Sequence, residues 1–180
     1  MSLEHISQQL AASEATGKKK LPPVELWDPP YCGEIDIQIK TDGSWFYNGG
    51  IFKRINLVKL FASVLKKEQG EYFLVTPVEK VKIAVEDAPF VLTQWQWQDG
   101  SQQAMVVSTN VDDEFILDKN HPLIISEVGD LYITVRRNLV AKVHRNVYYQ
   151  WVELASEVIT KRGKELVFTS SDHSFSLGKL

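Results

Sequence analysis

The sequence predicts an α+β fold with two β-rich lobes, each a mostly antiparallel sheet with one main helix. Three observations predict it: period-two alternation over most of the chain, clear helical apolar spacing in two segments, and the same order of strands and helix in both halves. The 180 residues, of which 44% are hydrophobic and 24% charged, have an ordinary globular composition. This length is enough for two small domains.

Residues 1–25 are expected to form a leader that is either a short helix or disordered. Leu3, Ile6 and Leu10 have weak helical spacing, and the segment then passes through Gly17-Lys-Lys-Lys20 into a pair of prolines. An N-terminal α+β lobe is predicted over 26–86, and a β-rich C-terminal lobe with one long helix over 87–180.

The N-terminal lobe begins with an alternating strand at 35–39, the turn signal Asp42-Gly43 and an aromatic strand at 44–47. Asn56 is the predicted N-cap of a helix whose apolar positions run to Leu65 and which Gly70 can stop. Strands are then predicted at 71–75 and 78–85, with Pro77 at the bend because it cannot donate to a ladder.

The C-terminal lobe is predicted to be mostly strands that form an antiparallel meander. A second helix opens at Asn146, carries Trp151 and Val158 on its apolar face, and ends before Gly163. The predicted strands are 90–97, 102–107, 114–117, 123–126, 131–135, 139–143, 166–169 and 175–177.

Both halves therefore have the order strand, strand, helix, strand, strand. In this pattern Asn56, Phe61 and Gly70 correspond to Asn146, Trp151 and Gly163. Duplication and independent convergence on the same pattern both explain the repeat. Either way, the sequence predicts two lobes that meet near residue 86, with a cleft between them as the expected ligand site.

Composition and motifs exclude several functional classes. The net charge is −3 with scattered Lys and Arg, which argues against binding to duplex nucleic acid. Cys32 is the single cysteine, the N-terminus lacks a signal-peptide pattern, and no apolar run approaches the roughly 20 residues of a membrane span, so a cytoplasmic protein without membrane insertion is expected. Dispersed histidines and the lack of phosphate-binding or nucleophile motifs predict neither a metal nor a cofactor.

The strongest polar candidates lie beside Pro77 and at the lobe junction. Lys80 could contact a phosphate or carboxylate, whereas Glu79, Glu86 or Asp87 could orient hydroxyl or amine groups. The alternative is a solvated strand edge whose charges prevent aggregation.

A basic group follows later in the chain at Arg136, Arg137, His144 and Arg145. It could take up an anion or pair with the acidic residues. Because neighbouring residues of a strand face opposite ways, at most one of Arg136 and Arg137 faces a given pocket. The polar lining would be completed by Thr76, Thr109 and Asn110, although an Asn in this position is equally suited to a local Asx turn.

Several longer motifs carry a family resemblance. They are Trp27-Asp-Pro, Cys32-Gly33-Glu-Ile-x-Ile, Asp42-Gly-x-Trp45, Leu57-Val-Lys-Leu-Phe-Ala62, Tyr72-x-Leu-Val-Thr-Pro-Val-Glu-Lys80, Val85-Glu-Asp-Ala-Pro-Phe90, Thr109-Asn-Val111 and His121-Pro122. From about Trp27 to the C-terminus the chain resembles the bacterial domain-of-unknown-function family 1285. The resemblance implies two domains built from duplicated motifs, a C-terminal domain superficially like a pleckstrin-homology fold, and a nucleotide-like ligand at the domain interface in a signalling role.

Three functional hypotheses follow. The first is a non-enzymatic module that binds a small anionic or nucleotide-like ligand between the lobes, with Lys80 and one basic strand residue as cations. The second is a scaffold that docks a protein partner on exposed strand edges. The third, an acid–base enzyme that uses Glu86 and Asp87, requires a strand break at Glu86, because adjacent strand residues point to opposite faces.

Overall fold

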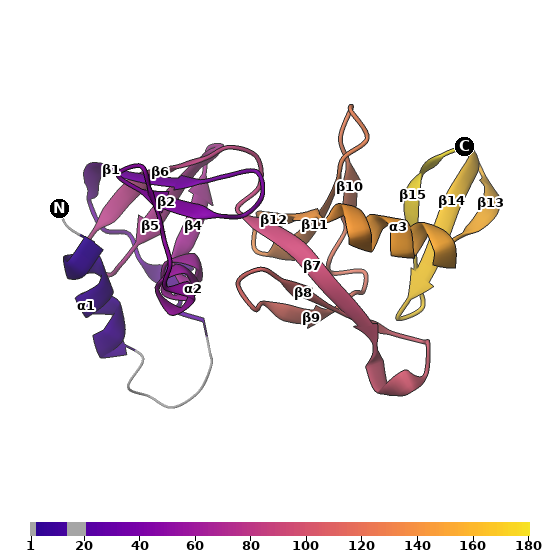
Figure 1. Ribbon diagram of the computed structural model, residues 1–180, viewed down its shortest axis with the longest axis horizontal. Coiled ribbons are helices and arrows are strands. Elements are labelled where there is room, and N and C mark those ends of the chain that lie inside the picture. Colours follow the sequence, from indigo (N-terminus) through magenta and orange to yellow (C-terminus); the bar gives the residue numbers. More distant parts are fainter. Residues whose placement is uncertain (1–2, 14–20) are drawn as a thin grey trace. The chain divides into compact units, whose positions relative to one another are not determined.

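The computed structural model describes residues 3–13 and 21–180, and the chain divides into two compact lobes after Asp87 (Figure 1). The α+β fold class with two β-rich lobes is confirmed. None of the helices within the described ranges has the length and apolarity needed to span a membrane. The Gly17–Lys20 part of the predicted leader lies outside the described residues.

The N-terminal lobe contains one six-stranded sheet, here called the first sheet, with the strand order β3-β2-β1-β6-β5-β4. All neighbouring strands are antiparallel except β1 and β6, which run parallel at the centre. The strands are β1 (Tyr31–Ile39), β2 (Trp45–Tyr47), β3 (Gly50–Ile51), β4 (Leu65–Glu68), β5 (Glu71–Val75) and β6 (Lys80–Val85).

Two helices and a short 3₁₀ turn, η2 (Val24–Leu26), complete this lobe. The helix α2 (Ile55–Ser63) buries Val58, Phe61 and Ala62, and Phe61 contacts the ring of Phe52 edge to face. The helix α1 (Leu3–Ser13) contacts α2 and buries Ile6 and Leu10. Residues 3–13 of the segment expected to be a leader thus form a short helix in this structure, and its apolar side chains belong to the core of this lobe.

Two predicted details of the first helix are wrong. The residue at the N-cap is Arg54, not Asn56, and the helix ends at Ser63, so Leu65 begins strand β4. The reason is the hairpin that follows, in which Gln69 and Gly70 both adopt positive φ, 50° and 85°. This two-residue turn pairs Lys66 and its neighbours with β5, and the ladder replaces another turn of helix.

The C-terminal lobe contains a second six-stranded sheet and a separate third sheet of three antiparallel strands, β13-β14-β15. The strands of the second sheet are β7 (Phe90–Trp97), β8 (Met105–Thr109), β9 (Glu114–Ile116), β10 (Leu123–Ile125), β11 (Leu131–Arg136) and β12 (Leu139–Val143). Those of the third sheet are β13 (Ser156–Thr160), β14 (Gly163–Ser170) and β15 (His173–Lys179). A 3₁₀ turn, η3 (Gln98–Gly100), follows β7, and the helix α3 (Arg145–Leu154) follows β12.

The two six-stranded sheets share one topology. The second sheet has the order β9-β8-β7-β12-β11-β10, with the parallel pair β12 and β7 at its centre, just as β6 pairs with β1. Each sheet consists of two antiparallel three-strand meanders that follow one another along the chain. The last strand of the second meander pairs with the first strand of the first meander. Helix α2 lies between the two meanders of the first sheet, whereas α3 follows the last strand of the second sheet.

The predicted order of two strands, one helix and two strands is also present around α2 and around α3. In the C-terminal lobe, however, the hairpin after the helix forms the third sheet instead of joining the second. The N-cap of α3 is His144, whose Nδ1 accepts a hydrogen bond from the Asn146 amide, so the predicted Asn146 cap is wrong. Val158 lies on β13 and not on α3, because the helix already ends at Leu154.

The third sheet packs on α3 through aromatic rings. Trp151 contacts Phe168 at 4.9 Å between ring centroids, and Phe168 stacks on Phe175 at 5.3 Å. The buried Ser170 hydroxyl donates to the Leu117 carbonyl at 2.6 Å and accepts from the Met105 amide at 2.9 Å. These contacts cover one face of the third sheet and leave its opposite face open.

Candidate functional site

The turn between β5 and β6 holds the first two predicted site residues. The buried Thr76 hydroxyl accepts hydrogen bonds from the amides of Val78 and Glu79, at 3.3 and 3.0 Å. Glu79 Oε1 lies 3.2 Å from Nδ1 of His5 on α1, while Glu79 Oε2 is buried without a hydrogen-bond partner among the described residues. Thr76 therefore fixes the turn, and the turn presents Glu79 to α1.

Lys80 lies on the first sheet in a cluster of alternating charges. Its Nζ is 2.9 Å from Glu68 Oε2 and 5.3 Å from the centroid of the Phe73 ring, and Lys66 Nζ contacts Glu68 Oε1 at 2.9 Å. Hydrogen bonds from Lys66 and then from Lys80 hold the pKa of the Glu68 carboxyl below its ordinary value. The two ammonium groups thus share one carboxylate.

Glu86 lies directly after β6 and closes the turn that follows β1. Its carboxylate accepts from Lys40 Nζ at 2.7 Å and from the Thr41 amide at 3.0 Å. These two interactions, the Lys40 bond first, lower the pKa of Glu86. Asp87 is half-buried and is the last residue of the N-terminal lobe.

Thr109 and Asn110 shape the loop between β8 and β9. The buried Thr109 hydroxyl accepts from the amides of Val111 and Asp113, at 3.4 and 3.2 Å. Asn110 Oδ1 accepts from the Val91 amide, and the Asn110 amide donates to the Val91 carbonyl, both at 2.9 Å. The loop is thereby tied to the beginning of β7.

Arg136, at the end of β11, reaches the same loop. Its guanidinium forms an ion pair with Asp113, and its Cζ lies 4.7 Å from the centroid of the Phe90 ring. Burial raises the pKa of the Asp113 carboxyl and lowers the pKa of the Arg136 guanidinium, and the attraction between the two charges opposes both shifts. Arg145 instead lies on the exposed surface of α3, where its Nε donates to the Tyr149 hydroxyl at 2.9 Å.

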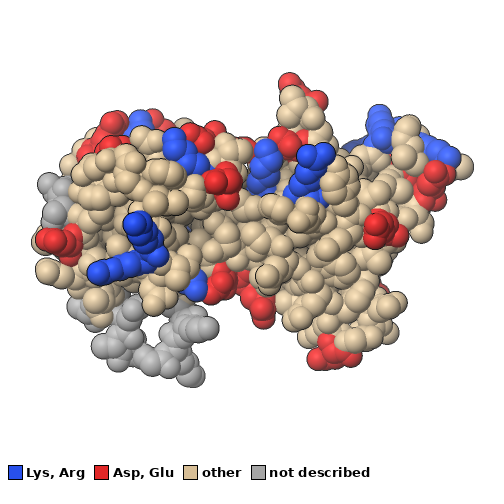
Figure 2. All heavy atoms as spheres, viewed as in Figure 1, with Lys and Arg blue, Asp and Glu red and all other residues tan. Residues whose placement is uncertain are grey.

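The structure thus distributes the predicted site residues over separate clusters. Thr76 and Glu79 share the β5–β6 turn, Lys80 lies near it with Glu68, and Thr109, Asn110 and Arg136 meet around the loop after β8. Sequence reasoning missed the partners Glu68 and Asp113, because neither stands in a motif. On the face shown in Figure 2, acidic and basic side chains alternate without a broad patch of one sign.

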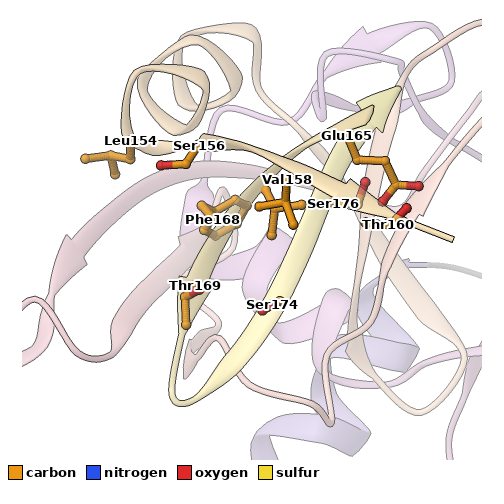
Figure 3. Close-up of a pocket in the computed structure, with 10 residues that line it drawn as sticks. Leu154, Ser156, Val158, Thr160, Glu165, Phe168, Thr169, Ser174 and Ser176 are labelled. Atoms are coloured by element: carbon orange, nitrogen blue, oxygen red, sulfur yellow. The ribbon is translucent and has the colours of Figure 1, made fainter. Parts of the chain in front are cut away.

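A groove of about 600 Å³ lies on the open face of the third sheet and was not predicted (Figure 3). Most of its lining side chains carry hydroxyls or aliphatic carbon, and one carries a carboxylate, Glu165. The lining residues are Leu154, Ser156, Val158, Thr160, Glu165, Val167, Phe168, Thr169, Ser174 and Ser176. A smaller pocket of about 370 Å³ lies along the irregular β1–β6 pairing.

None of the nine predicted site residues lines either of these two pockets. No group of three or more His, Cys, Asp or Glu side chains that could hold a metal ion is present within residues 3–13 and 21–180. The features that could bind a ligand are therefore the ion-paired side chains on the first and second sheets and the hydroxyl-lined groove on the third sheet.

Fold and clusters define a two-lobed α+β protein in which each lobe carries a six-stranded sheet of the same strand order. Family models support this division. Residues 22–88 match the N-terminal domain of the domain of unknown function DUF1285, and residues 89–177 match the C-terminal domain of the protein of unknown function DUF1285. The chain belongs to the DUF1285 family, as its motifs predicted.

Two solved structures are similar to this chain. A DUF1285 family protein from Silicibacter pomeroyi DSS-3 is 33% identical with a TM-score of 0.79, and the match covers 96% of this chain and 95% of that chain. A DUF1285 family protein from Shewanella baltica OS155 is 32% identical with a TM-score of 0.55, over 65% of this chain and 90% of that one. A comparison with curated proteins gives no match.

Proposed function

We propose that this protein is a non-enzymatic module that binds a small anionic, nucleotide-like ligand through Arg136. The observation that carries the proposal is the guanidinium held over the Phe90 ring and paired with Asp113. The Arg136 side chain is 11% exposed, and that of Asp113 is 20% exposed. A guanidinium fixed in this way loses little conformational freedom when a phosphate binds, and its planar fork suits phosphate oxygens.

The surroundings of Arg136 support this role. The Thr109 and Asn110 hydrogen bonds hold the loop that carries Asp113, so the position of the guanidinium is set by backbone contacts to β7. Rigid support of this kind is what a specific binding site requires. Arg145 is exposed on α3 and is left out of the proposed contacts, and Lys80 is tested separately because it belongs to the other lobe. Ligand occupancy would then be signalled to a partner in the cytoplasm.

Thermal unfolding with nucleoside mono-, di- and triphosphates tests the proposal. The test variant combines Arg136→Gln with Asp113→Asn, which removes both charges together and avoids a stranded buried carboxylate. Arg145→Gln is the matched control because it removes a surface arginine of α3. We expect at least one nucleotide to raise the unfolding midpoint of the wild type and of R145Q but not of the double variant. An equal response in all three proteins would refute the role of Arg136.

Lys80→Ala provides a separate arm in the same screen. If a nucleotide stabilises the wild type and the Lys80→Ala variant equally, Lys80 is not a ligand contact as the sequence predicted. This result would not bear on Arg136, which the double variant tests. The fold of this variant is checked by circular dichroism, because Lys80 also pairs with Glu68.

A second candidate function is a scaffold for a protein partner. It is favoured by the β10–β11 hairpin, where Ile124, Ile125 and Val128 are 47%, 42% and 85% exposed. Strand β10 is also the edge of the second sheet, so its outer backbone groups could pair with a strand of another protein. If Ile125→Lys abolishes a stoichiometric complex isolated with the wild type while R136Q/D113N retains it, the scaffold is preferred over the ligand module.

An acid–base enzyme is the weakest candidate. Strand β6 does end before Glu86, as that hypothesis required, yet the Glu86 carboxylate already accepts bonds from Lys40 and Thr41. A general base must be within hydrogen-bond reach of a substrate proton, and this carboxylate is engaged in closing a turn.

A further inference from the structure

The open face of the third sheet carries a continuous row of small polar and aliphatic side chains. Because directly paired residues of an antiparallel ladder share a face, the pairs Ser156–Val167 and Val167–Ser176 place these three side chains together. Val158 and Glu165 are also paired and lie on the same face. The groove is therefore a property of the strand register, and Figure 3 shows the side chains along it.

Glu165 is the unusual member of this face. It is only 8% exposed, and its carboxylate forms no hydrogen bond or ion pair with any residue in the described part of the chain. Three other shielded carboxylates each have a basic partner: Asp113 has Arg136, Glu68 has Lys66 and Lys80, and one oxygen of Glu79 has the His5 ring. The Glu165 oxygens are not fully buried, so the carboxylate is accessible from the groove, where it has no cation of the described chain as a partner.

Nearby lysines do not neutralise Glu165. Lys179 is its partner across the β14–β15 ladder, yet the Lys179 side chain is exposed and forms no ion pair with Glu165 in this structure. Lys164, the preceding residue of β14, points its ammonium to Glu157. The carboxylate therefore faces the groove without a cation of its own chain.

We propose that this groove binds a small organic ligand that carries a primary ammonium group on an aliphatic stem. The ammonium would pair with Glu165 and donate its remaining protons to the nearby hydroxyls of Thr160 and Ser176. The stem would lie on the carbon surface of Val158 and Val167. A single carboxylate in the groove matches a single positive charge, which distinguishes this ligand from polyamines.

The direct test uses n-hexylammonium as the probe and n-hexanol as its uncharged counterpart. Both are titrated into ¹⁵N-labelled full-length protein, and amide chemical shifts are followed by NMR. We expect hexylammonium to shift the amides of β13, β14 and β15 with saturation, and hexanol to bind much more weakly. Glu165→Gln keeps the shape of the side chain and should weaken hexylammonium binding by roughly tenfold or more, since hydrogen bonds to a charged group are the strong ones.

Glu157→Gln is the matched control. It also removes a carboxylate from the third sheet, but Glu157 is exposed and paired with Lys164. E157Q should bind hexylammonium as the wild type does. Shifts that do not localise to the third sheet, equal binding of hexanol, or unchanged binding by E165Q would each overturn the proposal.

Stability without ligand gives a second readout. If Glu165 has no cation partner in the free protein, E165Q should unfold at the same temperature as the wild type or at a higher one, because the substitution then removes no ion pair. Lys179→Met should leave the unfolding temperature nearly unchanged. A lower unfolding temperature for both E165Q and K179M would identify Lys179 as the partner of Glu165 in solution and would refute the ligand site. This outcome is independent of the Arg136 proposal, which concerns another sheet.

Discussion

The Cζ of Arg136 lies 4.7 Å from the centroid of the Phe90 ring, and the same guanidinium pairs with Asp113. The ring belongs to the first residue of β7, the arginine to the last residue of β11, and Asp113 precedes β9. One side chain thus connects three segments of the C-terminal lobe. Cation–π contact and the ion pair both act where much of the water is excluded, which strengthens each of them.

Breaking this ion pair from one side should destabilise the protein. Asp113→Asn is expected to lower the free energy of unfolding by about 2 kcal/mol, because the guanidinium keeps its charge and loses its closest counter-ion. The R136Q/D113N double variant should lose less than the sum of the two single variants. Urea unfolding of all four proteins measures this coupling. Additive losses would show that the pair contributes no interaction energy of its own.

Helix α1 is expected to stabilise the N-terminal lobe. Leu10→Ala should lower the free energy of unfolding by about 2–3 kcal/mol, because Leu10 is 1% exposed and its removal leaves a cavity. Glu4→Ala on the exposed face of the same helix is the control, with an expected change within about 0.5 kcal/mol. Chemical unfolding followed by tryptophan fluorescence provides the measurement. Equal effects for the two variants would mean that α1 does not stay packed in solution.

A substitution in the turn between β4 and β5 should stabilise the protein. Gln69 has φ of 50° and precedes Gly70 with φ of 85°, the combination of a type I′ turn, in which Asn is preferred at the first position. Gln69→Asn should raise the free energy of unfolding by about 0.5 kcal/mol. Gly70→Ala should lower it by about 1 kcal/mol because alanine resists positive φ. Thermal and urea unfolding should rank the three proteins Q69N, wild type and G70A in order of falling stability.

The ion pairs of Glu68 should make the stability of the folded protein depend on pH. Lys66 and Lys80 hold its pKa in the folded protein below the ordinary value, so its contribution is present at neutral pH and is lost as the pH falls through the folded-state pKa. Glu68→Gln should therefore be less stable than the wild type near pH 7, and the difference should shrink as the pH falls through the folded-state pKa of Glu68. A difference that persists unchanged to low pH would assign the effect to packing instead of charge.

Ser170 is expected to hold the third sheet to the second. Ser170→Ala should lower the free energy of unfolding by about 1–3 kcal/mol, because the buried Met105 amide and Leu117 carbonyl both lose their hydroxyl partner. Ser174→Ala, on the exposed part of β15, serves as the control and should change little. Hydrogen exchange adds a local readout, since faster exchange at Met105 is expected in the Ser170 variant alone.

Much of the fold was predictable from local pattern. The sequence placed β7 at 90–97 and β12 at 139–143 with their observed bounds, because alternating apolar residues between turn signals specify a half-buried strand. The segment from Leu65 to Glu68 was misassigned to a helix. Its apolar and polar residues fit the period of a helix and that of a strand, and only its pairing with β5 makes it a strand. Val158 was misassigned for the same reason.

The candidate site was less predictable. Thr76 and Thr109 were identified as polar residues near loops, but polar side chains in such positions serve turns and ligands equally well. Asp113, the partner of Arg136, was missed because 23 residues separate the two along the chain. Glu165 was missed because its strand gave only a short apolar signal at 166–169, and its burial depends on the curvature and packing of three strands.

The amino-acid sequence by itself determined most of the strands and helices of this protein and that the chain forms two β-rich lobes of the DUF1285 family, because periodicity and turn residues act within a few positions of one another. Only the tertiary structure decided the parallel central pair of each six-stranded sheet, the docking of α1, the partners of Glu68 and Arg136, and the isolated carboxylate of Glu165. Each of these features depends on which strands, distant in the sequence, pair with one another. That pairing is set by the free energy of the whole lobe and not by the preference of any local segment.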